Sequence, residues 1–286
     1  MATLYVVATP IGNLGDMSPR AVETLKAVAL IAAEDTRVTQ KLLNVFDIQT
    51  PLTSCHEHNE RGKAEQLVER MRSEGIDVAV TTDAGTPCIS DPGSVLVAQA
   101  VRAGIAVQAI AGPTAMAAAL SVSGMEATEF TFFGFLPRQK SELKAKLLDM
   151  ARRSKLGVVH ESPHRVIDLL AVLLETLPHT RVSASCDLTK KYECTVRGSV
   201  AEVLIALRSN PKAEKGEYCL VLEWAAEDIP QPEAPKSELS LEAQLFDGIV
   251  GGLTLRESGE RLVEGGERKN AVYAASLRVK QLLAQE

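Results

Sequence analysis

The residues best suited to chemistry gather in one stretch, residues 81–93, which reads TTDAGTPCISDPG. It holds two carboxylates, Asp83 and Asp91, among two glycines, two prolines and four hydroxyl side chains. Glycine lets a ligand approach the backbone, proline fixes the path of the chain, and Asp and Ser stabilise turns through their side chains. A surface loop can have this composition, but the density of such residues favours a binding site.

Three other short segments have a similar composition: residues 10–16 (PIGNLGD), 34–37 (EDTR) and 112–115 (GPTA). Each follows an apolar run of strand length. Loops after successive parallel strands lie at one edge of a sheet, where the ligands of open α/β proteins bind. We therefore expect residues 10–13, 34–37, 83–93 and 112–115 to converge.

Several common chemistries do not fit these loops. The sequence has no GxxxxGK[ST] motif and no GxGxxG after its first apolar run, which argues against a nucleotide triphosphatase and a Rossmann dehydrogenase. His56 and His58 have carboxylates nearby, but no other Cys or His matches them at metal-ligand spacing. We interpret them as part of a polar connection and expect no metal site.

The loops contain few strong bases or nucleophiles. This suits group transfer from a reactive cofactor, because the protein then mainly positions two reactants and excludes water. A sulfonium methyl donor fits, since its positive charge tolerates nearby Asp and Glu. Its adenosine needs backbone contacts rather than a phosphate-binding loop.

Strands and helices alternate from residue 3 to residue 122, which predicts parallel βαβ units and a sheet covered by helices on both faces. Ser18 as N-cap and Pro19 at the first helical position mark the start of the first helix. We expect strands at residues 3–9, 30–33, 51–55, 76–80 and 105–110, and helices from residue 19 and at 39–46, 59–74, 94–102 and 115–122.

A second α/β unit begins after residue 124. We expect strands at 130–135, 156–160, 181–188 and 217–224, helices at 141–153, up to 177 and at 200–208, and a polar segment at 189–197. Residues 225–240 are acidic and rich in proline, as linkers are. The predicted division is an N-terminal α/β domain at 1–123, a C-terminal α/β domain at 124–226, a linker at 227–240 and a small helical module at 241–286. Glycine pairs at 251–252 and 265–266 break this module into three helices, and spacing leaves open whether it is helix-turn-helix-like or a packed tail.

The composition, 286 residues with 45% hydrophobic and 24% charged, is typical of a globular protein. No apolar run is long enough to span a membrane, and the first residues lack the basic region of a secretory signal. The five cysteines are odd in number and scattered, which indicates reduced thiols in a cytoplasmic protein. We expect Cys186 and Cys194 to be buried.

The net charge of −6 argues against a surface coated with bases for unspecific nucleic-acid binding. Residues 138–155 are an exception, because seven basic and two acidic side chains give this segment a charge of +5 against −11 for the rest. A solvated helix face and a local phosphate-binding patch both explain such a run.

Several motifs together carry a resemblance to one family. DAGTPCISDPG (83–93), ATPIGNLGDMSPRA (8–21) and AEDTR (33–37) are similar to the ribosomal RNA small subunit methyltransferase I family, a branch of the tetrapyrrole-methylase-like methyltransferases. The similarity covers essentially the whole chain, with further matches at GFLPRQ (134–139), ESPHR (161–165), LTKKYE (188–193), KGE (215–217) and RKNAVY (268–273). Cys186-Asp187 departs from the Arg-Glu usual in the family, and Ser162 from its usual Ala or Thr.

The resemblance implies two α/β domains of the tetrapyrrole-methylase type, S-adenosylmethionine in the cleft between them, a homodimer, and a helix-turn-helix-like tail that faces RNA. It also implies 2′-O-methylation of the ribose of a cytidine in the decoding region of small-subunit (16S) ribosomal RNA. By motif position, it implies cofactor contacts from Pro10, Ala84, Gly85, Thr86, Ile89, Thr114, Ala115, Glu161 and Leu188.

A ribose hydroxyl is a weak nucleophile, so its attack on a methyl group benefits from a general base. The candidate catalytic residues are Asp35, Asp83 and Glu161, and related tetrapyrrole methylases have a proton-handling Asp in the loop that holds Asp35 here. Asp91 is a further candidate, although its place before Pro92 favours a turn-stabilising role. Lys190 would have to be neutral to act as a base.

Four side chains are candidates for contacts with RNA phosphates: Arg138, Lys140, His164 and Arg165. Arginine binds phosphate through two parallel hydrogen bonds. The last two also follow Pro163 at an expected helix start, which attracts anions.

Two other functions remain open from the sequence. A small-molecule methyltransferase acting on a tetrapyrrole would not need the basic helix or the C-terminal module. A non-catalytic RNA- or ribosome-binding protein would not need intact cofactor loops. The sequence does not identify the modified nucleotide, the general base, or whether free RNA or the assembled subunit is the substrate.

Overall fold

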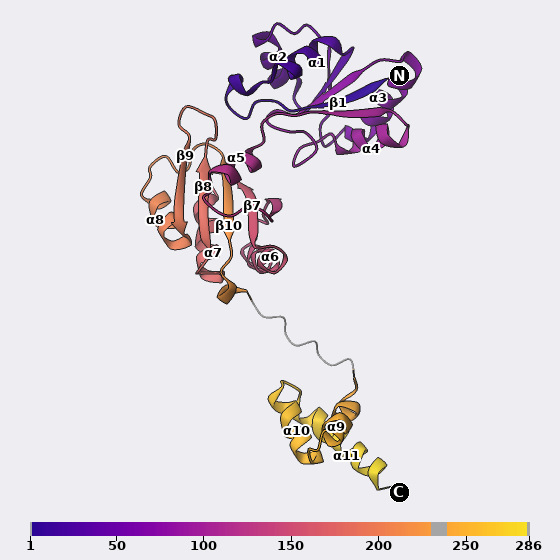
Figure 1. Cartoon of the computed structure of the whole chain (residues 1–286), viewed down its shortest axis with the longest axis vertical. Coiled ribbons are helices and arrows are strands. Elements are labelled where there is room, and N and C mark those ends of the chain that lie inside the picture. Colours follow the sequence, from indigo (N-terminus) through magenta and orange to yellow (C-terminus); the bar gives the residue numbers. More distant parts are fainter. Residues whose placement is uncertain (1, 230–238, 285–286) are drawn as a thin grey trace. The chain divides into compact units, whose positions relative to one another are not determined.

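The computed structural model describes residues 2–229 and 239–284, which divide into two compact units, Met1–Pro230 and Gln231–Glu286 (Figure 1). The linker expected at 227–240 falls largely on residues 230–238, outside the described residues. Residues 226–228 at its start form a short 3-10 helix. The domain boundary expected between residues 123 and 124 stays a prediction.

A five-stranded sheet forms the N-terminal part of the first unit, and its strand order is β3-β2-β4-β1-β5. All its strand pairs are parallel, as the sequence predicts. Every residue of β2 and β4 is buried, as expected for central strands covered on both faces. The strands are β1 (Thr3–Val7), β2 (Leu30–Ala33), β3 (Leu52–Ser54), β4 (Val78–Thr81) and β5 (Ala106–Ile110).

Two pairs of helices cover the opposite faces of this sheet. The helices α1 (Pro19–Ala27) and α2 (Thr36–Val45) pack on one face around Leu25 and Leu43. On the other face, α3 (Glu60–Glu74) and α4 (Ser94–Arg102) pack around residues such as Leu67. The first helix begins as predicted, with the Ser18 hydroxyl accepting a hydrogen bond from the N–H of Ala21.

The second helix begins at Thr36, three residues before the expected start at Thr39. Asp35 is its N-cap, and the carboxylate of Asp35 accepts a hydrogen bond from the N–H of Arg37. Such a cap satisfies a donor that otherwise lacks a partner in the first turn. The loop after β2 is therefore shorter than the sequence suggests.

A second five-stranded sheet has the order β6-β7-β10-β8-β9. Only β6 and β7 are parallel, and the remaining pairs are antiparallel. The strands are β6 (Thr131–Phe135), β7 (Leu156–Glu161), β8 (Arg181–Cys186), β9 (Cys194–Ser199) and β10 (Tyr218–Glu223).

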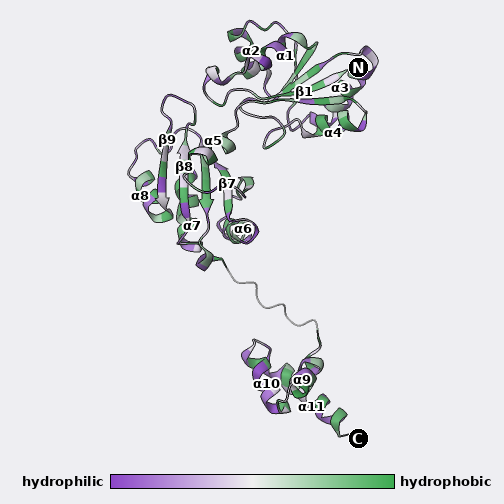
Figure 2. Ribbon diagram, in the orientation of Figure 1, coloured by the Kyte–Doolittle hydropathy of each residue, from purple (hydrophilic) through white to green (hydrophobic). Residues whose placement is uncertain are grey.

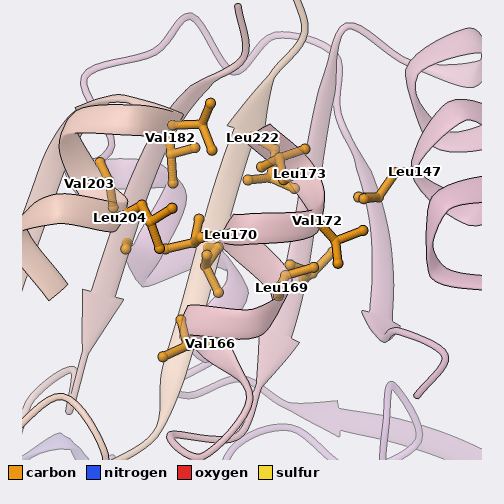
Figure 3. Close-up of a cluster of buried hydrophobic side chains, with 14 of the residues drawn as sticks. Leu147, Val166, Leu169, Leu170, Val172, Leu173, Val182, Val203, Leu204 and Leu222 are labelled. Atoms are coloured by element: carbon orange, nitrogen blue, oxygen red, sulfur yellow. The ribbon is translucent and has the colours of Figure 1, made fainter. Parts of the chain in front are cut away.

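Helices α6 (Lys140–Arg153), α7 (Val166–Thr176) and α8 (Val200–Arg208) share the large core of this second sheet. Figure 3 shows leucine and valine side chains of α7 and α8 meeting those of β8 and β10. The helix α5 (Ala115–Val122) packs on a separate cluster with residues of β7 and β10. In Figure 2 the strands of both sheets are mostly hydrophobic, in agreement with these cores.

The polar segment expected at 189–197 is partly wrong, because residues 194–199 form the edge strand β9. No residue of β9 is buried, and its sequence, CTVRGS, lacks the alternation of apolar and polar residues that marks a half-buried strand. Cys194 lies opposite Cys186 in the register of β8 and β9. Both thiols are free, and Cys186 is buried as expected, whereas Cys194 is exposed, contrary to expectation.

The second unit contains the three expected helices, α9 (Leu241–Val250), α10 (Leu255–Glu264) and α11 (Lys269–Leu283), packed around Leu245, Ala275 and Val279. Gly252 and Gly266 have positive φ angles of 91° and 98°, which explains the glycine at each break. In the described parts of the chain, no helix has both the length and the apolar character needed to cross a membrane.

Candidate active site

The predicted convergence of loops at the carboxyl edge of the first sheet is confirmed. The N–H of Thr9 donates to the carbonyl of Gly85 at 2.8 Å, and the N–H of Gly85 donates to the carbonyl of Thr9 at 3.0 Å. The Thr86 hydroxyl donates to the carbonyl of Pro113 at 3.2 Å. Two backbone hydrogen bonds and one hydrogen bond from a side-chain hydroxyl therefore tie three of the expected loops together. The N–H of Asp35 donates to Oδ1 of Asp83 at 3.2 Å, which joins the fourth loop.

A cavity of about 360 Å³ opens where these loops meet the second sheet. Of the expected cofactor-binding residues, Ala84, Gly85, Thr86, Ile89, Thr114, Ala115, Glu161 and Leu188 line it. Pro10 does not, but its neighbour Ile11 does. The cavity thus combines the edge of the parallel sheet with side chains of β7 and the segment after β8.

Sequence reasoning missed part of the cavity wall, namely Ser90, Met116, Phe132, Phe135, His160, Pro163, Glu217, Tyr218 and Cys219. Most of them lie in or beside strands of the second sheet, where apolar residues read as core. The concentration of phenylalanines at 130–135 was the available signal.

A buried carboxylate on α3 holds the main loop in place. Glu60 is 7% exposed, and its Oε1 accepts hydrogen bonds from the N–H groups of Gly93 and Val95, both at 2.8 Å. These donors belong to the N-terminus of α4, which favours a negative charge. Gly93 has a φ of 120°, and a Cβ there would lie 2.8 Å from Sγ of Cys88. The loop path therefore depends on a glycine and on a residue 33 positions earlier.

Asp35 does not line the cavity, and its carboxylate is bound by the neighbouring Arg37. Its Oδ2 is 2.6 Å from Nη2 of Arg37, and its Oδ1 accepts from the N–H of Arg37 at 2.8 Å. The hydrogen bonds from Arg37 hold the pKa of Asp35 well below its usual range. A carboxylate stabilised in this way is a weak base.

Glu34, Asp83 and Asp91 form an acidic group at the edge of the cavity. The Thr82 hydroxyl and the N–H of Asp83 donate to Oε2 of Glu34 at 2.5 and 3.2 Å. Burial, together with the charge of Glu34, raises the pKa of Asp83. Burial and the charges of Glu34 and Asp83 raise the pKa of Asp91 to about 6. Only Asp91 of this group lines the cavity.

Glu161 also lines the cavity, whereas the other two principal candidates, Asp35 and Asp83, do not. Its Oε1 accepts from the N–H of Ser162 at 2.8 Å. Its Oε2 is buried and has no hydrogen-bond donor in the described residues, although Nη2 of Arg165 lies 3.4 Å away. Burial raises the pKa of Glu161. A buried acceptor without a donor is costly, which points to a ligand that supplies one.

The four expected phosphate-binding residues are not equally available. Arg165 donates to the carbonyls of Leu136 and Pro137 at 3.3 and 3.0 Å, and so faces the protein. Lys140 is paired with Glu175 at 3.0 Å. Arg138 and His164 are exposed, and neither forms an ion pair within residues 2–229 and 239–284.

Lys190 is held between two carboxylates, with Nζ 2.7 Å from Oε2 of Glu217 and 3.1 Å from Oδ1 of Asp187. These hydrogen bonds outweigh partial burial and raise the pKa of Lys190. It is therefore a cation at neutral pH and not a general base. Within the described ranges, no group of His, Cys, Asp and Glu side chains is arranged to hold a metal ion.

Comparisons with known proteins agree with this architecture. The family model for Tetrapyrrole (Corrin/Porphyrin) Methylases matches residues 3–204. Ribosomal RNA small subunit methyltransferase I of Bacillus subtilis (strain 168) is 39% identical over 277 residues, covering 96% of this chain and 94% of that protein. A protein of the same name from Synechocystis sp. is 42% identical over 265 residues, covering 92% and 93%.

Solved structures share the fold at low sequence identity. Diphthine synthase superimposes with a TM-score of 0.59 at 13% identity, covering 80% of this chain and 93% of that one. The methyltransferase CobJ gives a TM-score of 0.57 at 18% identity, covering 79% and 95%. At these identities the likeness concerns the fold alone, and it confirms the predicted α/β architecture.

Proposed function

Since this chain belongs to the ribosomal RNA small subunit methyltransferase I family, within the tetrapyrrole methylases, and is a methyltransferase, we propose that it methylates the ribose 2′-hydroxyl of a cytidine in small-subunit ribosomal RNA. The methyl donor in this proposal is S-adenosylmethionine. The supporting observation is the agreement between relatives that match nearly the whole chain and a cavity lined by the residues expected to hold this cofactor.

The chemistry of the cavity fits S-adenosylmethionine. Its walls are backbone-rich loops with Gly85 and Thr86, and it contains no phosphate-binding loop. Oε2 of Glu161, buried and without a donor, suits an amine or hydroxyl of the cofactor. Asp91 adds a negative charge, which favours a sulfonium cation. When bound, the cofactor supplies an electrophilic methyl group.

The residue that we assign as general base is Asp91. It lines the cavity, and its raised pKa of about 6 makes it more basic than an ordinary aspartate while it remains ionised at pH 7. Its carboxylate would take the proton of the 2′-hydroxyl, while the bound cofactor would supply the methyl group, with the thioether sulfur as the leaving group. Asp35 is stabilised as an anion by Arg37, and Lys190 is protonated, so both suit structural roles better.

Ribosomal RNA as the substrate is supported by two basic surfaces, each within its own unit. Arg138 is exposed near the cavity, and its charge acts on Glu161. On α11, Lys269 and Lys280 flank Tyr273, which is 68% exposed, and neither lysine forms an ion pair in the described residues. Cations around an exposed aromatic ring suit phosphates and unstacked bases.

The proposal includes a homodimer, as the family resemblance implies, that acts in the cytoplasm, as the scattered cysteines indicate. Light scattering of the purified protein at micromolar concentration tests the dimer. A monomer at these concentrations would contradict that part and leave the reaction unaffected.

The decisive experiment is methyl transfer from labelled S-adenosylmethionine to small ribosomal subunits that lack the modification, followed by alkaline hydrolysis of the RNA. A 2′-O-methyl group blocks cleavage at the next phosphate, so the label should appear in an alkali-resistant dinucleotide that begins with cytidine. Large ribosomal subunits are the matched negative control. Label in a mononucleotide would place the methyl group on a base and contradict ribose methylation.

A further inference from the structure

Phe135 is exposed in a way that its type does not explain. It lines the cavity, yet it is 64% exposed. Phe132, on the same strand, is half-buried and packs against the core between α5 and the second sheet. A single exposed apolar residue is normal on a protein surface, but an exposed aromatic ring in the wall of a cavity has a free face on which a ligand ring can stack.

An irregularity in β6 aims this ring at the cavity. In the register with β7, Phe132 pairs with Val158 and Gly134 pairs with Val159, so Phe133 is an extra residue in the strand. Gly134 has a φ of 63°, which glycine adopts without strain. Without the extra residue, alternation along the strand would direct Phe132 and Phe135 to opposite faces. With it, both lie on the cavity side, while Phe133 packs into the large core.

The ring of Phe135 is supported on one side by His160. Their ring centroids are 5.8 Å apart with the planes tilted by 52°. His160 also contacts the ring of Phe132 edge-on, with centroids 5.0 Å apart. His160 thus fixes the position of Phe135 from within, and the exposed side of the ring faces outward at the cavity mouth.

We propose that Phe135 is the platform on which the base of the acceptor nucleotide stacks, with Arg138 binding an adjacent phosphate. This inference rests on the proposed function and names the residues that hold its substrate. Aromatic rings bind unpaired bases of single-stranded RNA by stacking, and a nucleotide that is splayed out of a helix can place its base and its ribose together in a pocket. The deeper walls, formed by residues such as Gly85 and Glu161, are left to the cofactor.

The position of Arg138 supports this assignment. It follows Phe135 by three residues, is exposed, and has no ion-pair partner in the described part of the chain. Burial raises the pKa of Glu161, which lines the cavity, and the charge of Arg138 opposes part of this rise, so Arg138 lies within electrostatic reach of the cavity wall. A guanidinium beside a stacked base is well placed for the phosphate of the same or the next nucleotide.

The test compares Phe135→Leu, Phe135→Trp and Phe130→Leu in the full-length protein. Phe130 is the matched control, because it is 40% exposed but does not line the cavity. Three quantities are measured: the Kd for S-adenosylmethionine, the Kd for small ribosomal subunits, and the KM for subunits in methyl transfer. Cofactor binding also reports whether each variant is folded.

We expect Phe135→Leu to raise the Kd and KM for subunits by roughly 5- to 100-fold, the effect of losing one base–aromatic stack, with the cofactor Kd changed less than twofold. Phe135→Trp should restore binding, and Phe130→Leu should leave all three quantities unchanged. An equal loss of cofactor affinity in Phe135→Leu, or unchanged subunit binding, would overturn the inference. If the wild-type protein binds subunits without methylating them, the proposed reaction is contradicted. The ratio of the subunit Kd of Phe135→Leu to that of the wild type still decides the role of Phe135.

Discussion

Lys190 lies directly against Gly12, so closely that a Cβ added to Gly12 would be 2.4 Å from Cγ of Lys190. Gly12 belongs to the loop after β1, and Lys190 follows β8 in the second sheet. Because Lys190 also bridges Asp187 and Glu217, it fixes the first loop against the far wall of the cavity. Lys190 of the LTKKYE motif (188–193) therefore positions the loop after β1 and does not transfer a proton.

Gly12→Ala should lower kcat/KM for methyl transfer by roughly tenfold or more, because Lys190 must move and carry Ile11 or Glu217 with it, and misplacement by about 1 Å costs up to about 10²-fold. Steady-state kinetics measure the loss. Gly62→Ala is the control, since a Cβ there meets nothing within 4 Å. Unchanged kinetics in Gly12→Ala would show that this contact does not shape the site.

Asp91→Asn should lower kcat at saturating cofactor by roughly 10²- to 10⁴-fold, the range typical of a lost general base. It should also raise the Kd for the cofactor, because the charge that favours the sulfonium cation is lost. For the wild-type protein, kcat should fall as the pH drops through about 6, because protonation of Asp91 removes the base. Single-turnover rates between pH 5 and 8 test this. Asp168→Asn, at an exposed position on α7, is the control. A pH profile that is flat across pH 6 would remove Asp91 from this role.

The same substitution should stabilise the fold at neutral pH. The pKa of Asp91 is higher in the folded state than in the unfolded state, so the folded state binds the proton more tightly. This contribution to the free energy of unfolding is present at low pH and is lost as the pH rises through about 6. Asp91→Asn removes the buried charge, and Tm should rise at pH 7.5, with the gain shrinking toward pH 4. Differential scanning calorimetry at both pH values measures it. A lower Tm at pH 7.5 would contradict the sign.

Glu60→Ala should lower the free energy of unfolding by about 1–3 kcal/mol, because the buried N–H of Gly93 and the partly buried N–H of Val95 at the start of α4 lose their acceptor. Urea denaturation measures the change. Glu60→Gln keeps an acceptor oxygen and should recover part of the loss. Glu65→Ala, at an exposed position on the same helix, should have little effect. Equal midpoints for Glu60→Ala and Glu65→Ala would contradict the role of Glu60.

Much of the fold follows from local patterns in the sequence. The first sheet is parallel, as alternation of strands and helices predicts, and α1, α5 and α8 begin where capping or spacing indicates. The convergence of the loops follows from the same topology. The edge strand β9 was missed, because nothing in its sequence distinguishes an exposed strand from a polar loop.

The candidate site was harder to foresee, because its missed residues depend on long-range pairing. Phe135 reaches the cavity through a one-residue shift between β6 and β7, which no local pattern reveals. The place of Asp91 before Pro92 favours a turn residue, and its raised pKa depends on burial and on the charge of Glu34, which is 57 positions away in the sequence. Motif matching found most of the cavity loops but gave no ranking among the carboxylates.

Arg138→Glu should weaken binding to small ribosomal subunits more than Lys144→Glu does, although both residues belong to the basic segment 138–155. Lys144 is 2.9 Å from Glu175, and Lys146 is 3.3 Å from Asp149, so their charges are partly neutralised within the protein. Arg138 has no such partner in the described residues.

Filter binding between 50 and 200 mM salt measures the effect. The slope of log K against log salt concentration should be about 0.7 to 0.9 shallower for Arg138→Glu, as expected for one lost phosphate contact. The Kd for S-adenosylmethionine should stay constant in both variants. Equal slopes for the two variants would show that phosphates displace the internal partners and that the whole basic helix binds RNA.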